Sequence, residues 1–483
     1  MKQTSLEMQN TVYQRIAEYK QMVASDPYRL HYHLMPPIGL LNDPNGFVFF
    51  RGNYHIFYQW NPFETAHGAK FWGHYISNDL VHWQEAPIAL APDSWYDKNG
   101  CYSGSTVVHD DKMYVFYTGN VKNQYGERES YQCLAISEDG IIFEKMGPII
   151  EVPEGYTAHF RDPKVFQQND RWYMVLGAQT LEEKGEAVLY SSSNLLNWNF
   201  EGTIAGSEKN ALGEFGYMWE CPDFITLDGQ DILLVCPQGL TQKGYDYQNI
   251  FQSGYFVGKA ELNKATFRHG EFHELDHGFD FYAPQTTTDA KGRHLLFGWM
   301  GNAEEEGVIQ PTVKYEWIHA LTIPRKLTWQ NGKLLQQPVE ELRQLRTNEL
   351  RYVNTDLSNM KLEGGEVFEM LLEVNQWKGK SFSMKIGNTT SISYDAITKT
   401  LTFERQSFHT NGKLEQRYCV LDSLQSFHIF KDTSSIEIFI NHGERVLSSR
   451  VFDNLDNKEI IFHVDGMVEA TISKWNLTRV TAY

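Results

Sequence analysis

Apolar and polar residues follow two different periods along the chain, one in a short N-terminal stretch and another in the region after it. Over residues 5–24 the apolar side chains are spaced by three or four, at Met8, Val12, Ile16, Tyr19 and Val23. This spacing predicts a short amphipathic helix that packs on the outside of the next domain. Beyond the helix, short aromatic and β-branched runs alternate with Gly, Asn and Asp turns, which predicts strands.

The strand signals repeat. A polar turn followed by a strongly apolar run occurs five times, at residues 52–59, 111–118, 170–177, 229–236 and 292–299. Equivalent positions in these runs are separated by 59, 59, 59 and 63 residues. A period of this length, filled with strands and turns, predicts one four-stranded sheet per unit and a five-bladed β-propeller. A stacked solenoid is the alternative, but these units are long for one.

The pattern changes near residue 337. Residues 338–346 have the character of a short helical linker, and strictly alternating runs follow at 366–374, 380–386, 434–441 and 458–464. Such runs, separated by turn signals, predict an antiparallel β-sandwich. We therefore expect an all-β protein with four parts. They are a helical segment (1–29), a five-bladed propeller (30–336), a linker (337–352) and a C-terminal β-sandwich (353–483).

One position in the repeat carries polar or aromatic residues in every unit. Ten to twelve residues before each equivalent strand position stand Asp43, Ser103, Asp162, Glu220 and Tyr282. Each falls at the start of the first strand of its predicted blade. Because the first strand of a blade lines the central channel of a propeller, we expect these five residues to converge on one axial pocket.

Three of the five residues are acidic, and placing three carboxylates close together costs repulsion and raises the pKa of at least one. Glycosidases need such a group, because one carboxylate attacks the sugar while a protonated one donates to the leaving oxygen. Each motif also has a purely structural interpretation. Asp43 lies in turn-forming dipeptides, Arg161 and Asp162 could form a local salt bridge, and Glu220 could belong to a buried ion pair.

Composition narrows the function further. The chain has 43 basic and 61 acidic residues and a net charge of −18, which disfavours nucleic acid and anionic membranes as partners. The start of the chain lacks the apolar core of a signal peptide, and the five cysteines are scattered without a CxxC pair. We therefore expect a cytoplasmic protein without disulfides, metal or cofactor; His31 and His33 have no third ligand at suitable spacing.

Several motifs together carry a family resemblance. They occupy residues 31–46, 59–62, 72–83, 102–105, 160–163, 219–224, 280–285 and 297–300, in order along nearly the whole predicted propeller. With these motifs the chain strongly resembles glycoside hydrolase family 32, the β-fructofuranosidases. Residues 434–444 look like the C-terminal sandwich of that family. The run at 96–105 and the start without a signal look like its bacterial intracellular sucrose-6-phosphate hydrolases.

The resemblance implies a five-bladed propeller with a β-sandwich and cleavage of terminal β-fructofuranosides with retention. Asp43 would be the nucleophile, Glu220 the general acid and then base, and Asp162 a stabiliser of the transition state. Residues that fall where the family holds the sugar are Asn42, Gln59, Tyr102, Ser103, Arg161, Tyr282 and Trp299. Two departures also touch the expected site: His67 stands where secreted invertases tend to have Trp, and Leu40-Leu41 replaces the commoner Trp-Met.

The roles set expectations for the ionisation of the three acids. We expect Asn42 to keep the pKa of Asp43 low, and apolar Trp219 to favour protonated Glu220. Arg161 is expected to hold Asp162 ionised. As a retaining pair, Asp43 and Glu220 should have carboxyl groups roughly 5–5.5 Å apart.

The expected reaction is hydrolysis of sucrose 6-phosphate, or of sucrose, to glucose 6-phosphate or glucose plus fructose. Exo-hydrolysis of short fructans is the nearest alternative. A pentose-releasing five-bladed glycosidase and a sugar-binding propeller without activity are more distant ones. A small sugar is the expected partner, and an edge of the sandwich could mediate a homodimer.

Overall fold

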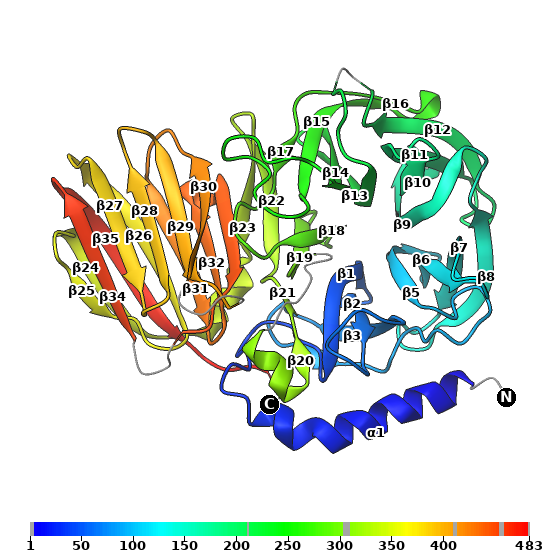
Figure 1. Cartoon of the computed structure of the whole chain (residues 1–483), viewed down its shortest axis with the longest axis horizontal. Coiled ribbons are helices and arrows are strands. Elements are labelled where there is room, and N and C mark those ends of the chain that lie inside the picture. The colour runs from blue at the N-terminus through cyan, green and yellow to red at the C-terminus, as the bar shows by residue number, and fades with distance from the viewer. Residues whose placement is uncertain (1–3, 210–211, 303–309, 409–412, 454–457, 482–483) are drawn as a thin grey trace.

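The N-terminal helix has the sequence-predicted boundaries. A computed structural model of the chain describes residues 4–209, 212–302, 310–408, 413–453 and 458–481, and its first element is α1 (Ser5–Ala24). Thr4 and Glu7 cap its N-terminus reciprocally, which satisfies two free backbone N–H groups. The predicted apolar face is confirmed, because Val12 and Val23 are fully buried in the core. Figure 1 shows α1 lying along the outside of the larger domain.

Five sheets of four or five strands form the larger domain, one for each sequence repeat. The first sheet contains β1 (Gly39–Phe50), β2 (Asn53–Asn61), β3 (Phe71–Ser77) and β4 (Gln84–Glu85). The second contains β5 (Cys101–His109), β6 (Lys112–Lys122), β7 (Arg128–Ser137) and β8 (Glu144–Glu151). The third contains β9 (Tyr156–Gln168), β10 (Arg171–Thr180), β11 (Gly185–Ser192) and β12 (Asn199–Gly206).

The fourth and fifth sheets each carry an additional short strand. The fourth contains β13 (Met218–Leu227), β14 (Gln230–Gln238), β15 (Gly254–Glu261), β16 (Thr266–His269) and β17 (His273–Glu274). The fifth contains β18 (Tyr282–Thr288), β19 (His294–Met300), β21 (Ala320–Leu321), β22 (Arg325–Gln330) and β23 (Lys333–Pro338). Short 3₁₀ turns η1 (Leu262–Lys264) and η2 (Pro311–Tyr315) lie in the connections.

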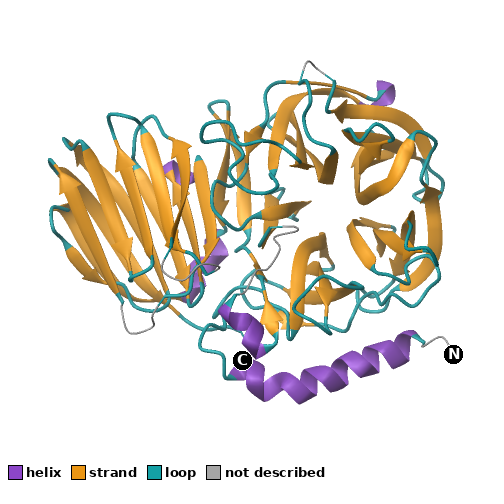
Figure 2. Cartoon of the chain, in the orientation of Figure 1, coloured by secondary structure: helices purple, strands orange, loops and turns teal. Residues whose placement is uncertain are grey.

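The first strands of the five sheets form a closed ring around the axis. β1 contacts β5 and β18, β5 contacts β9, and β13 contacts both β9 and β18. The sheets radiate from this ring in Figure 1, and the secondary-structure view of Figure 2 shows orange strands joined by teal loops throughout the domain. The predicted five-bladed propeller is therefore confirmed, and the five repeated positions all lie on the strands nearest its axis.

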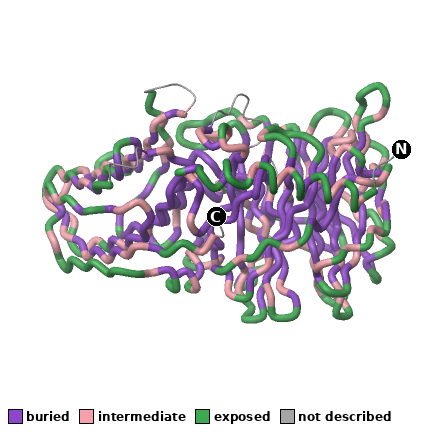
Figure 3. Tube along the Cα trace, turned by 90° about the horizontal axis from the view of Figure 1, so that it is seen from below, coloured by how far each residue is buried: buried purple, intermediate pink, exposed green. Residues whose placement is uncertain are grey.

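Two devices hold neighbouring blades together. β20 (Trp317–Ile318), which follows the fifth blade's first two strands, pairs in parallel with β1 and so closes the ring. In addition, an aromatic residue after the turn of a repeat packs on the preceding blade. Trp83 contacts Phe297 of the fifth blade, and Trp198 contacts Phe116 of the second. Figure 3 shows the resulting dense band of buried chain through the propeller.

The second domain is a sandwich of two six-stranded sheets. One contains β24 (Arg346–Asp356), β26 (Phe368–Trp377), β31 (Ser426–Asp432), β32 (Ser435–Ile440), β33 (Arg445–Arg450) and β35 (Val468–Leu477). The other contains β25 (Lys361–Glu363), β27 (Ser381–Ile386), β28 (Thr390–Asp395), β29 (Thr400–Gln406), β30 (Leu414–Val420) and β34 (Glu459–Asp465). η4 (Asn441–Gly443) forms the turn between β32 and β33. The predicted sandwich is confirmed.

The connection between the domains is shorter than the expected linker over 337–352. β23 continues to Pro338, the 3₁₀ helix η3 (Glu340–Leu345) comes directly after it, and β24 begins at Arg346. β24 is exposed along almost its whole length because it is an edge strand. Its side chains therefore lack the clear apolar alternation that marks the other sandwich strands in the sequence.

A fully buried arginine joins the two domains. Arg325 of β22 donates to Asp276 (3.2 Å) and, across the interface, to Glu437 of β32 (2.7 Å). It also donates to Ser448 of β33 (2.6 Å). Removing the guanidinium takes the counter-ion from buried Asp276 and leaves buried Glu437 with His33 as its remaining partner, which is far more costly than losing a surface pair.

We expect Arg325→Met to lower the free energy of unfolding by about 3–5 kcal/mol. The measurement is chemical denaturation at neutral pH. Arg51→Met is the matched control, because Arg51 pairs with Asp111 on the exposed surface and its loss should leave the denaturation midpoint almost unchanged. Equal, small losses in both variants would contradict the role of Arg325 at the interface.

Candidate active site

All five inner strands are interrupted where the site residues stand. The register of pairing shifts at Asp43 in β1, Ser103 in β5, Asp162 in β9, Cys221 in β13 and Ala283 in β18. Such bulges bend a strand and redirect its side chains. A proline, which cannot donate to a ladder, falls in four of the five bulges, at Pro44, Pro163, Pro222 and Pro284. The repeated irregularity turns polar side chains towards the axis.

Asp43 is held by three polar side chains from two blades. Its Oδ2 accepts a 2.5 Å hydrogen bond from the Ser103 hydroxyl of the second blade. Asn42 donates to Oδ1 at 3.1 Å, and Gln59 of β2 approaches Oδ2 at 3.4 Å. Asn42 also donates to the Gln59 amide oxygen at 3.1 Å. These contacts fix the orientation of the carboxylate and leave it at the cavity wall.

Glu220 of the fourth blade is held by residues from three blades. Arg161 of β9 donates to Oε1 through both Nε (3.0 Å) and Nη2 (2.6 Å). Tyr282 of β18 donates its hydroxyl to Oε2 at 2.8 Å, and Gln238 of β14 donates to the same oxygen at 2.7 Å. Arg161 was expected beside Asp162, but its hydrogen bonds go to Glu220.

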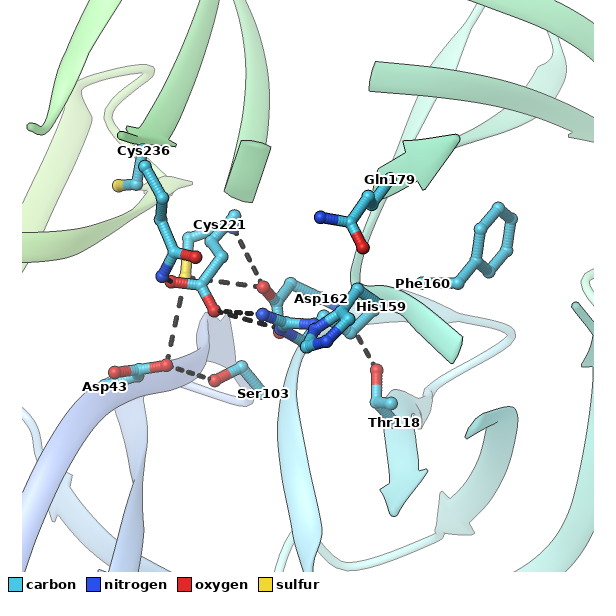
Figure 4. A network of polar contacts seen from close by, with 12 residues as sticks. Asp43, Ser103, Thr118, His159, Phe160, Asp162, Gln179, Cys221 and Cys236 are labelled. Atoms are coloured by element: carbon cyan, nitrogen blue, oxygen red, sulfur yellow. Dashed lines mark hydrogen bonds and ion pairs between the residues drawn. The ribbon is translucent and has the colours of Figure 1, made fainter. Parts of the chain in front are cut away.

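Asp162 is linked to the other two acids through Cys221 of β13. Its Oδ2 accepts from the backbone N–H of Cys221 at 2.9 Å, next to Glu220 in the chain. The Cys221 sulfur lies 3.7 Å from this oxygen and 3.8 Å from Asp43 Oδ2, so one atom separates the two aspartates. Figure 4 shows Asp43, Asp162 and Cys221 converging from separate blades. Residues far apart in sequence thus form one carboxyl cluster.

The ionisation of the cluster differs from the expectation. Burial and the negative charge of Glu220 raise the pKa of Asp43, although the hydrogen bond from Ser103 opposes this. Burial raises the pKa of Asp162 to about 7. Burial also acts on Glu220, but the charge and hydrogen bonds of Arg161 outweigh it and lower the pKa of Glu220. The low pKa expected for Asp43 and the protonated Glu220 are therefore wrong for the sugar-free pocket. The strongly raised pKa belongs to Asp162 instead.

A cavity of about 440 Å³ opens over the cluster. Its walls include ten of the residues that the sequence proposed: Asn42, Asp43, Gln59, His67, Tyr102, Arg161, Asp162, Glu220, Tyr282 and Trp299. Ser103 reaches the site through its bond to Asp43. Leu40 and Leu41 do not line the cavity. They lie in β1 between β2 and β20, and Leu41 is fully buried in the core, so they support the strand of Asp43 from behind.

His67 stands at the cavity with its ring edge-on to Trp299, at 6.4 Å between ring centres. The side chain is open to solvent on the pocket side, but the surrounding protein and the charge of Lys70 lower its pKa to about 4. A cationic His67 at neutral pH is therefore not supported, and the ring can act only as a neutral hydrogen-bonding group.

Several cavity residues were not predicted from the sequence. They are Gly68, Ala69, Lys70, Asn99, Asn120, Lys122, Arg128 and Gln238. The repeat contains a signal for two of them, because Asn61, Asn120, Gln179 and Gln238 stand at or within two residues of the ends of the second strands, at intervals of 59 residues. Lys70 has no such signal. Its buried amine has no hydrogen-bond partner among the described residues, and burial lowers its pKa to about 7.

The axial cavity of this propeller holds three carboxyl groups and an arginine, and the propeller is joined to a β-sandwich. This fold and this site place the protein among the glycoside hydrolases. Comparison with known families places the chain within that class. Residues 33–338 match the N-terminal domain of the glycosyl hydrolases family 32, and residues 340–479 match the C-terminal domain. The chain belongs to glycosyl hydrolase family 32. Among the described residues, no helix is both long and apolar enough to cross a membrane.

Individual relatives cover the whole chain. A sucrose-6-phosphate hydrolase from Bacillus subtilis is 50% identical over 476 residues, which are 98% of each chain. The solved sucrose-6-phosphate hydrolase of Lactobacillus gasseri has a TM-score of 0.87 at 32% identity, covering 97% of both chains. A GH32 β-fructofuranosidase of Bombyx mori, solved as a mutant in complex with sucrose, also has a TM-score of 0.87 at 32% identity, covering 100% of both chains.

Proposed function

We propose that this enzyme hydrolyses sucrose 6-phosphate to glucose 6-phosphate and fructose, with retention at the fructosyl carbon. The observation that carries the proposal is the cluster of Asp43, Asp162 and Glu220 at one cavity. The phosphorylated substrate is supported by the 50% identity to a sucrose-6-phosphate hydrolase along the full chain. Without the phosphate, the same chemistry would act on sucrose.

In the proposed reaction, Asp43 attacks the fructosyl C2 and forms a covalent fructosyl-enzyme. Glu220 protonates the departing glycosidic oxygen and then removes a proton from the water that releases fructose. Asp162 accepts hydrogen bonds from fructose hydroxyls as positive charge develops on the ring. Ser103 and Asn42 suit this scheme, because they donate to Asp43 and hold its lone pairs in one direction. The carboxyl separation of roughly 5–5.5 Å stays a prediction.

The proton needed by Glu220 is available within the cluster. In the sugar-free pocket burial raises the pKa of Asp162 to about 7, so this carboxyl group can take up a proton near neutral pH. Fructose hydroxyls that donate to Asp162 stabilise its ionised form and so lower its pKa. Because the two acids titrate together, lowering the proton affinity of one raises the proton share of the other. We infer that sugar binding transfers the proton to Glu220, where the leaving oxygen receives it.

The proposal predicts a clear order among substrates. We expect kcat/KM for sucrose 6-phosphate to exceed that for sucrose by at least about tenfold, which corresponds to about 1.4 kcal/mol of additional transition-state binding. The short fructan kestose is the third substrate, because exo-hydrolysis of fructans is the nearest alternative reaction. The measurement is initial-rate kinetics on the three substrates side by side at one pH. Equal values of kcat/KM for sucrose 6-phosphate and sucrose would show that the phosphorylated sugar is not the preferred substrate. If no fructose were released from any of the three, the proposed hydrolase activity would be wrong.

Two further expectations stay predictions. A cytoplasmic location suits a phosphorylated sugar substrate and five cysteines that are all free thiols. A homodimer through the sandwich would need an open strand edge, and β24 supplies one, with Leu350 and Val353 exposed on it. The pentose-releasing and non-catalytic alternatives have no observation in their favour.

A further inference from the structure

Two cations face each other at the mouth of the cavity. Lys122 ends β6 and Arg128 begins β7, and the two residues are direct partners across this antiparallel hairpin. Both line the same cavity as the carboxyl cluster. Lys122 is exposed and Arg128 is half-buried, whereas Asp162 is buried at the base of the cavity. The hairpin therefore presents two positive charges above the reacting groups.

Repulsion between Lys122 and Arg128 lowers the stability of the fold unless a bound anion neutralises their charges. Like charges directly opposite on a β-ladder repel each other. Four cationic side chains, Lys70, Lys122, Arg128 and Arg161, line the cavity. Of these four side chains, only Arg161 forms a salt bridge to a carboxylate of the described residues, and its partner is Glu220. The chain as a whole carries a net charge of −18, so the positive charge at the mouth of the cavity is opposite in sign to the charge of the protein as a whole.

Arg128 is held in a fixed position although no carboxylate of the described residues pairs with it. Its guanidinium lies 6.0 Å from the centre of the Tyr102 ring, and its Nη1 lies 3.4 Å from His159 Nδ1. The same nitrogen of His159 accepts a 2.9 Å bond from Arg161. Burial and the two neighbouring arginines lower the pKa of His159 to about 4, so the ring is neutral and its Nδ1 lone pair faces both guanidinium groups, with the shorter contact to Arg161. A pre-positioned arginine loses less entropy when it binds an anion.

The preferred anion follows from the geometry of the donors. A planar guanidinium and a flexible ammonium side by side match the several oxygens of a phosphate better than a single carboxylate. Asn99 and Asn120 line the same side of the cavity and offer neutral amide groups. The fructosyl unit must lie at the carboxyl cluster, so the leaving glucosyl unit lies towards the mouth, where these cations are.

We propose that Lys122 and Arg128 bind the phosphate group on the glucosyl C6 of the substrate and so select the phosphorylated sugar. This inference rests on the proposed function, and it names the residues that confer the substrate preference. Lys70 is not a ligand in this assignment. It lies deeper, where its charge acts on Asp43.

The test is the double variant Lys122→Gln/Arg128→Gln. We expect the ratio of kcat/KM for sucrose 6-phosphate to that for sucrose to fall by at least about tenfold, because two charge-assisted contacts are lost. Most of the change should appear in KM for the phosphorylated sugar. The inhibition constant of glucose 6-phosphate should rise by a similar factor, while that of glucose should not.

Lys112→Gln is the matched control. Lys112 is at the other end of β6, pairs with Glu138 on the surface and is not part of the cavity wall. The control should keep the wild-type ratio, and a thermal unfolding curve for each variant confirms that it is folded. If the wild type prefers sucrose 6-phosphate and the folded double variant keeps that preference, the assignment to Lys122 and Arg128 is wrong. If the wild type has no preference, the proposed substrate fails first and this inference falls with it.

Discussion

Asp43→Asn is expected to lower kcat for the preferred substrate by at least about a thousandfold while leaving the fold intact. The amide is nearly the same size as the carboxylate but cannot act as a nucleophile. Its oxygen can still accept the hydrogen bond from Ser103, so the local network has no cause to collapse. The measurement is steady-state kinetics together with the thermal unfolding midpoint of the purified variant.

The same substitution elsewhere provides the control. Asp111 forms an exposed ion pair with Arg51 at the outer turn of the second blade, so Asp111→Asn should retain wild-type turnover. Turnover of Asp43→Asn within about tenfold of the wild type would mean that another group forms the bond to the sugar. That result would show that Asp43 is not the nucleophile.

Glu220→Gln is the second variant with a very large expected effect, and the effect should depend on the leaving group. On the natural sugar we expect a loss of at least about a thousandfold in kcat, because the leaving oxygen must be protonated. On an aryl β-fructofuranoside such as the p-nitrophenyl derivative, the loss in the first step should be much smaller. A nitrophenolate departs without a proton, so the general acid contributes little to that step.

The pH profile separates this role from a structural one. As the pH rises through about 7, the carboxyl cluster loses the proton that Asp162 holds in the sugar-free enzyme, and wild-type activity on the natural sugar should fall. Glu220→Gln acting on the aryl substrate should lack this decline. Glu138→Gln on the surface is the matched control and should behave as the wild type. An equal loss on both substrates in kcat/KM, which reports the first step, would show that Glu220 is not the proton donor.

The repeat made both the architecture and the acidic cluster predictable. Because every unit contains the same strand-and-turn pattern, equivalent positions are equivalent in space, and Asp43, Asp162 and Glu220 had to meet near the axis. Applying the same comparison to the ends of the second strands also reaches Gln238, which donates to Glu220. The short connection between the domains was less predictable, since the exposed strand β24 carries little apolar alternation.

Partners inside the site could not be assigned in the same way. Arg161 is the chain neighbour of Asp162, yet it bonds to Glu220, because consecutive residues of a strand project in different directions. The contact with Arg161 lowers the pKa of Glu220, and burial raises the pKa of Asp162 to about 7, which is the reverse of the expectation. Lys122 and Arg128 were missed for a related reason, since nothing in the linear pattern shows that the β6–β7 hairpin reaches over the pocket.

The amino-acid sequence alone determined the five blades, the sandwich behind them and the three acids on the axis. These features depend on periodicity, which a one-dimensional pattern records directly. Only the tertiary structure decided which group neutralises which, in which direction the pKa of each acid shifts and which cations border the mouth of the cavity. Charges and hydrogen bonds depend on distances of a few ångströms between different blades, and chain spacing does not encode those distances.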